Sequence, residues 1–126
     1  MGFWTRRNWM TLGAVGGFVA VAVGAFAAHG VRDDPRAAEL LRTGATYGFM
    51  HTMATFASAT FMQVGARRAR FAPGFFLSGV ALFSGSLYAL ALGAPDWVGA
   101  ITPVGGLLFL AGWATLAWAA RGVDPH

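Results

Sequence analysis

The chain has 126 residues, of which 56% are hydrophobic and only 11% are charged. A soluble domain carries about 25% charged residues, so this composition excludes a small soluble fold, and the large apolar share excludes a disordered chain. All nine cationic side chains are arginines that do not gather on one soluble face, which argues against nucleic acid as a partner. Cysteine is absent, which excludes disulfides and thiolate metal sites. An integral membrane protein remains, with the lipid bilayer as its first partner.

Four apolar stretches are long enough to cross a bilayer, because about 20 residues rising 1.5 Å each cover roughly 30 Å of hydrocarbon. They run over about 9–28, 44–65, 73–92 and 102–120. Thr102 and Pro103 are typical of a helix start and place the beginning of the last stretch. We therefore expect residues 1–126 to form a single all-α domain, a bundle of four transmembrane helices.

An alternative for the first stretch is a cleavable signal peptide. Arg6 and Arg7 precede the apolar run, and Ala25-Phe26-Ala27 resembles a small-residue cleavage site. We expect the stretch to stay in the protein as a span.

The loop after the first span carries the pattern of a short amphipathic helix. Asp34 can serve as the N-cap, and Pro35 suits the first helical position. Apolar residues then recur at helical spacing, and Arg36, Glu39 and Arg42 fall on the other face, where opposite charges can pair. We expect this segment to lie at the outer interface and to lead into the second span.

The arginines predict the orientation, because positively charged loops stay in the cytoplasm. Six of them lie on the side that holds both termini: Arg6, Arg7, Arg67, Arg68, Arg70 and Arg121. The other side holds three, together with four acids: Arg32, Arg36, Arg42, Asp33, Asp34, Glu39 and Asp96. Both termini should therefore be cytoplasmic.

Small residues recur at helical spacing along the spans, as they do where membrane helices approach closely. The glycines that we expect to mediate packing are Gly13, Gly17, Gly24, Gly85, Gly105 and Gly112. In the third span Gly85 belongs to a stripe with Ala81, Ala89 and Gly93. We expect that stripe to face another helix, so that Gly85→Leu would disrupt the bundle.

A polar row in the second span is the main candidate for a site. Tyr47, His51 and Thr55 follow one another at intervals of four residues, and Ser58 extends the row. Such a row should face the bundle interior. His51 could accept a proton or contact a ligand there. Alternatively, it is a neutral histidine whose hydrogen bonds go across the bundle to a backbone carbonyl or to Ser84, Ser86 or Tyr88.

Other chemistry is hard to find in the sequence. His29 ends the first span before Gly30, where a charged imidazole suits the helix dipole. His29 and His51 fail as a pair of haem ligands, because the rise per residue puts them about 10 Å apart in depth. All five acids lie outside the spans, so no buried carboxylate pair is available for acid–base catalysis. We expect no bound metal, no cofactor and no enzymatic activity.

Four segments together carry a resemblance to a known family. They are GAFAAHG at 24–30, YGFMH at 47–51, LFSGSLY at 82–88 and ITPVGG at 101–106. The chain resembles the small bacterial membrane proteins of the domain-of-unknown-function family four-two-three, with Ala27 standing where that family would have glycine. The resemblance implies a four-helix protein of the bacterial inner membrane without an established activity. It also implies a characteristic core of His29, His51, Ser84, Ser86, Tyr88, Thr102 and Pro103.

The sequence favours a structural or accessory subunit that packs against a larger membrane complex, respiratory or photosynthetic. The small-residue stripes exceed what a lone four-helix bundle needs, and no soluble domain or catalytic set accompanies them. One alternative is a small transporter or channel, assembled as a homo-oligomer, with the polar row of His51 lining its path. Another is a protein that binds a quinone or a different cofactor at His51.

Overall fold

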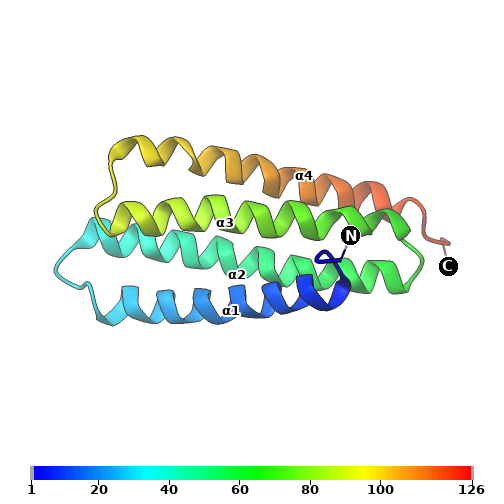
Figure 1. The fold of residues 1–126 in the computed structure, drawn as a ribbon, viewed down its shortest axis with the longest axis horizontal. Helices are drawn as coiled ribbons and strands as arrows, with labels where there is room; N and C mark the ends of the chain where they lie inside the picture. Colours follow the sequence, from blue (N-terminus) through cyan, green and yellow to red (C-terminus); the bar gives the residue numbers. More distant parts are fainter. Residues whose placement is uncertain (1, 126) are drawn as a thin grey trace.

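The computed structural model describes residues 2–125 as four α-helices that run up and down in alternation (Figure 1). The helices are α1 (Arg6–His29), α2 (Pro35–Gln63), α3 (Ala72–Ala91) and α4 (Thr102–Ala120). Two 3-10 turns precede the last two helices: η1 (Arg67–Phe71) and η2 (Asp96–Ala100). Both ends of the chain lie at the same end of the array (Figure 1). The prediction of an all-α protein with four helices is confirmed.

The helices stand side by side in chain order, and the array is not a closed bundle. α2 packs between α1 and α3, α3 packs between α2 and α4, and within residues 2–125 α1 does not touch α4 (Figure 1). The predicted bundle of four helices thus takes the form of an open array, an arrangement that the sequence analysis did not specify. In lipid, closing the array would gain no hydrophobic free energy, because lipid tails are as apolar as the side chains that they contact.

Three of the four helices are long and apolar enough to cross a membrane. These segments are Arg6–His29, Arg67–Ala91 and Asp96–Ala120. The predicted span at 44–65 falls in α2, which does not belong to this group. α2 is 29 residues long, lies between two other helices, and buries His51 and several hydroxyl side chains. A helix that faces protein on both sides tolerates more polar residues than one that faces lipid.

The start of α2 confirms the predicted capping. Asp34 accepts a hydrogen bond from the backbone N–H of Ala37 at 3.1 Å, and Pro35 is the first helical residue. Glu39 and Arg42 form the expected ion pair at 2.8 Å. The amphipathic segment is not a separate interfacial helix, however. It continues into α2 without a break, and its apolar side is buried in the array.

Most of the predicted packing glycines lie at helix contacts. A Cβ on Gly105 would lie 2.7 Å from Cβ of Phe83, a Cβ on Gly112 would overlap the ring of Phe76, and a Cβ on Gly13 would lie 3.3 Å from the Phe56 ring. Gly17 and Gly24 have looser neighbours at 3.8 Å. The prediction for Gly85 is wrong. Gly85 is exposed, and a Cβ there would meet no atom within 4 Å. The small-residue stripe of Gly85 lies on the outer side of α3, because the opposite side of this helix packs against α2 and α4.

This difference between two glycines gives a matched test of the packing. Gly105→Ala should lower the free energy of unfolding by about 1–3 kcal/mol, because the added methyl group pushes against the backbone of Phe83. Gly85→Ala makes the same chemical change on an exposed face where the methyl group meets no neighbour, and it should leave stability unchanged or raise it by up to about 1 kcal/mol, because alanine favours a helix more than glycine does. Thermal unfolding in detergent measures both, and equal losses would mean that the helices are packed differently.

Candidate functional site around His51

His51 lies inside the array, enclosed by aromatic side chains of α3 and α4. Only 3% of the residue is exposed. The ring of Phe109 stacks on the imidazole with a centroid distance of 3.6 Å and an interplanar angle of 4°. Phe76 and Trp113 lie at 5.8 Å and 5.9 Å, with Trp113 turned edge-on. The imidazole is therefore packed as part of an aromatic core, and we call these four residues the His51 cluster.

Both imidazole nitrogens are engaged in hydrogen bonds. Nδ1 lies 2.7 Å from the backbone oxygen of Tyr47, and the indole N–H of Trp113 donates to Nε2 at 3.0 Å. A carbonyl can only accept and an indole N–H can only donate, so the ring must carry one proton, on Nδ1. The arrangement holds a neutral histidine in a single tautomer. Neither nitrogen is left for a metal, a haem iron or a quinone.

Two glycines allow the phenylalanines to reach His51. A Cβ on Gly79 of α3 would lie 2.6 Å from the ring of Phe109, and a Cβ on Gly112 of α4 would lie 2.6 Å from the ring of Phe76. Each helix thus inserts a phenylalanine into a gap that a glycine leaves on the other. The close contact between α3 and α4 and the enclosure of His51 depend on the same four residues.

The predicted polar row does not form a continuous polar lining. Thr55 and Ser58 are buried, but their hydroxyls donate to the carbonyls of His51 and Ala54 within α2, both at 3.0 Å. Tyr47 lies on the surface, 42% exposed, with its ring against Phe83. The row therefore consists of hydroxyls satisfied by their own helix, with one exposed ring at its end.

Ser84, Ser86 and Tyr88 are not partners of His51, which corrects that part of the prediction. Ser84 donates across the helix contact to the carbonyl of Gly44 at 2.6 Å, and the Tyr88 ring packs over Gly44. Ser86 shares a hydrogen bond with Thr102. These serines join α3 to α2 and α4. His51 does bond to a backbone carbonyl, but this carbonyl belongs to Tyr47 of its own helix and not to a helix across the bundle.

His29 lies apart from this cluster. It is exposed at the end of α1, whereas the rings around His51 come from α3 and α4. Within residues 2–125 no group of three histidines and acids is placed to hold a metal ion. Every buried side-chain nitrogen or oxygen in that range has a hydrogen-bond partner.

Sequence analysis missed the three aromatic residues of the His51 cluster. One signal was available: Trp113 lies well inside its helix, whereas the other tryptophans lie near the ends of the spans. An indole N–H in the middle of a predicted membrane span needs an acceptor, because lipid offers none. Phe109 precedes Trp113 by four residues and so lies on the same side of α4. Their pairing with an acceptor on α2 could not be deduced without the helix order.

Comparison with known proteins places this chain in a protein family. The model of a protein family of unknown function, DUF423, matches residues 23–106. The chain belongs to this family. The resemblance inferred from the four sequence segments is thereby confirmed.

Several relatives match along nearly their whole length. A UPF0382 membrane protein of Haemophilus influenzae is 44% identical over 115 residues, which cover 90% of this chain and 93% of the relative. The UPF0382 inner membrane protein YgdD of Escherichia coli is 41% identical over 115 residues, 89% and 88% of the two chains. A UPF0382 membrane protein of Staphylococcus epidermidis is 34% identical over 112 residues, 87% and 92%. No solved structure matches the chain. The DUF423 protein described here is thus a small, multi-pass integral protein of the inner membrane.

The hydrogen bond between Trp113 and His51 can be tested by a conservative change. Trp113→Phe keeps an aromatic ring but leaves Nε2 without a donor, and it should lower the free energy of unfolding by about 1 kcal/mol. Trp97→Phe is the matched control, because Trp97 is 69% exposed and has no such role. Thermal unfolding in detergent should separate the two variants, and an equally small effect of both would rule out a contribution from this bond.

Proposed function

We propose that this DUF423 protein is a structural or accessory subunit of a larger membrane complex and catalyses no reaction itself. The observation that carries the proposal is that the hydrogen-bonding groups of the His51 cluster are already satisfied. His51 has both nitrogens occupied, and the ring of Phe109 stacks on its imidazole. A catalytic or ligand site would need a group that is free to act. Hydrogen bonds and ring contacts that are satisfied within the protein hold its helices together, which suits a packing role.

The open array supports the same proposal. α1 rests mainly on α2, and its outer side presents Val15, Phe18 and Val21, which are 53%, 78% and 63% exposed. At the other edge, Leu107 and Leu110 of α4 are 66% and 65% exposed. These two apolar edges do not meet each other, and either can pack against a neighbouring transmembrane protein.

The geometry gives less support to the two alternatives. A transporter path along the polar row would need hydroxyls that face an opening, but Thr55 and Ser58 are buried and bonded to their own helix. A quinone site at His51 would need a free ring nitrogen. We therefore rank both behind the accessory subunit.

We also propose that α2 is a fourth span and that both termini are cytoplasmic. α2 packs along both α1 and α3, which are candidate spans, so it should cross the same bilayer.

The arginines support the orientation. Arg6 lines one recess with Arg67 and Arg70, and the Arg68 guanidinium lies 4.5 Å over the ring of Trp118 near the end of α4. The arginine-rich side is thus a single end of the array, as the positive-inside rule requires.

The absence of cysteine makes this orientation easy to test. Asp33→Cys and Val64→Cys place one thiol before and one after α2. In spheroplasts, a maleimide that cannot cross membranes should label Asp33→Cys at once and Val64→Cys only after lysis. Labelling of both from the same side would show that α2 does not span. The opposite order would reverse the orientation.

The accessory role is tested in the native membrane. A photoreactive amino acid replaces Phe18 on one apolar edge or Leu107 on the other, and illumination of the membranes crosslinks it to whatever lies against that edge. The protein is then recovered in a mild detergent together with anything bound to it. We expect a discrete protein adduct from one edge and a stoichiometric partner complex by mass spectrometry. Lipid adducts alone at both edges, with the chain recovered as a free monomer, would contradict the proposal.

A further inference from the structure

A chain of recesses links the arginine-rich end of the array to its membrane-facing side. The first, about 710 Å³, is lined by Arg6, Met62, Arg67 and Arg70. The second, about 440 Å³, shares Arg6, Met62 and Arg70 with it and adds an apolar wall that includes Trp4 and Gly74. The third, about 520 Å³, shares Trp4 and Gly74 with the second and lies between α1 and α3. Each recess shares lining residues with the next, so the three lie next to one another, and we refer to them together as the groove.

The outer part of this groove is positively charged. Its three arginines come from two segments far apart in the sequence, the start of α1 and η1. Arg70 donates to the carbonyl of Arg67 at 3.2 Å and lies over the Phe71 ring, which holds its side chain in place. No acidic side chain of residues 2–125 lines either of the two outer recesses. Guanidinium groups arranged in this way suit a phosphate.

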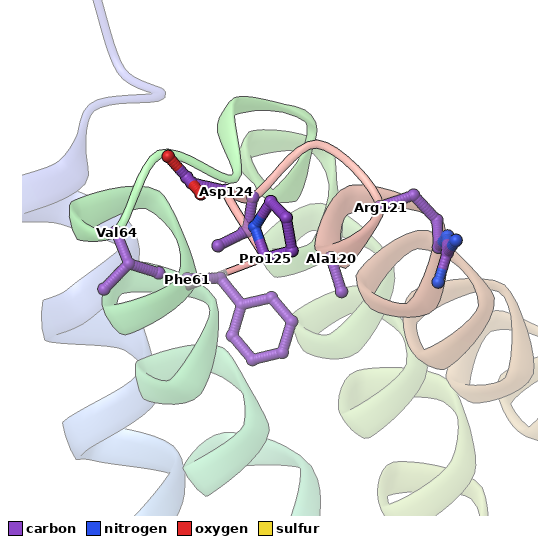
Figure 2. Close-up of a pocket in the computed structure, with 7 residues that line it drawn as sticks. Phe61, Val64, Ala120, Arg121, Asp124 and Pro125 are labelled. Carbon is purple, nitrogen blue, oxygen red and sulfur yellow. The ribbon is translucent and has the colours of Figure 1, made fainter.

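The acids of the chain lie elsewhere. Four of the five lie at the opposite end of the array, near the connections from α1 to α2 and from α3 to α4: Asp33, Asp34, Glu39 and Asp96. Asp124 lies at the arginine-rich end, but it lines a separate recess with Phe61, Val64 and Arg121 (Figure 2). Neither of the two recesses lined by Arg6 and Arg70 includes Asp124 in its lining.

The inner part of the groove is apolar. Leu12 of α1 and Leu77 of α3 line its walls, and Thr52 of α2 lies at its floor. The Thr52 hydroxyl donates to the carbonyl of Phe49 at 2.9 Å, so its methyl group is turned toward Gly16 of α1. Ser78 also lines this recess, and its hydroxyl donates to the carbonyl of Gly74 at 2.6 Å, so both hydroxyls are bonded within their own helices and the rest of the lining is apolar. A hydrocarbon chain fits it.

The groove has the depth of one leaflet. From Arg6 to Gly16 the helix rises by roughly 15 Å, about half of the roughly 30 Å of hydrocarbon in a bilayer. In the orientation proposed above, the arginines stand at the cytoplasmic membrane surface and the apolar part reaches toward the midplane. This combination matches a lipid with a charged headgroup and an acyl chain.

We propose that this groove binds an anionic phospholipid, with its phosphate among Arg6, Arg67 and Arg70 and an acyl chain between α1 and α3. Basic recesses between transmembrane helices on the cytoplasmic side favour such headgroups. A helix of another protein would fill the apolar part but would leave the arginines without a counter-charge. The site is independent of the accessory role, because it concerns one lipid in a defined place.

The test is native mass spectrometry of the purified chain in detergent with equal amounts of phosphatidylglycerol and phosphatidylethanolamine that carry the same acyl chains. We expect the wild type to bind phosphatidylglycerol about tenfold better. Arg6→Gln with Arg70→Gln should remove this preference. Arg32→Gln with Arg36→Gln removes the same charge at the opposite end and should keep it. If the first double variant does not fold, Arg6→Gln alone should weaken the preference.

Two further arms separate a lipid site from a phosphate site. Glycerol 3-phosphate at the same concentration should not displace phosphatidylglycerol. Ala81→Phe fills the inner groove and should reduce the binding of both lipids, whereas Leu107→Phe on the outer side of α4 should not. The proposal would be overturned if the wild type bound the two lipids equally, or if both double variants lost the same amount of binding. It would also be overturned if glycerol 3-phosphate displaced phosphatidylglycerol, or if Ala81→Phe left lipid binding unaltered.

Discussion

The structure depends on one imidazole that joins the helices on either side of α3. α2 and α4 stand on either side of α3, yet the indole of Trp113 on α4 reaches His51 on α2. The second ring nitrogen bonds to the carbonyl of Tyr47, so the ring cannot rotate without losing both bonds. Phe76 of α3 completes the enclosure. Three helices are thus held in register at one point, in a medium where apolar burial alone does not bring helices together.

The glycines around this point act as spaces rather than as flexible links. Gly79 and Gly112 make room for the two phenylalanines, and Gly44 makes room for Tyr88, which in turn brings Ser84 to the Gly44 carbonyl. Close approach and hydrogen bonding therefore occur at the same places. In residues 2–125 every buried side-chain nitrogen and oxygen has a hydrogen-bond partner, and a function based on outer surfaces fits that interior better than one based on chemistry at its centre.

Composition and local signals predicted much of this fold. The helix start at Asp34 and Pro35 and the Glu39–Arg42 pair follow from rules that act within one turn. Gly85 shows where such rules end. A stripe of small residues indicates close packing but not which partner it packs against, and only the helix order places this one outward. The partner of His51 lay 62 positions away on another helix, so neither the row on α2 nor its spacing could identify Trp113.

The tautomer of His51 tests this account most directly. A variant with His29→Gln and His126→Gln keeps His51 as the sole histidine, and nitrogen-15 spectra of its imidazole report which nitrogen carries the proton. The account predicts a neutral ring protonated on Nδ1, with Nε2 coupled through a hydrogen bond to the indole nitrogen of Trp113. A ring protonated on Nε2, or an imidazolium at neutral pH, would contradict it. Either result would mean that the two hydrogen bonds do not hold His51 in this state, and His51 would again be a candidate for binding a ligand.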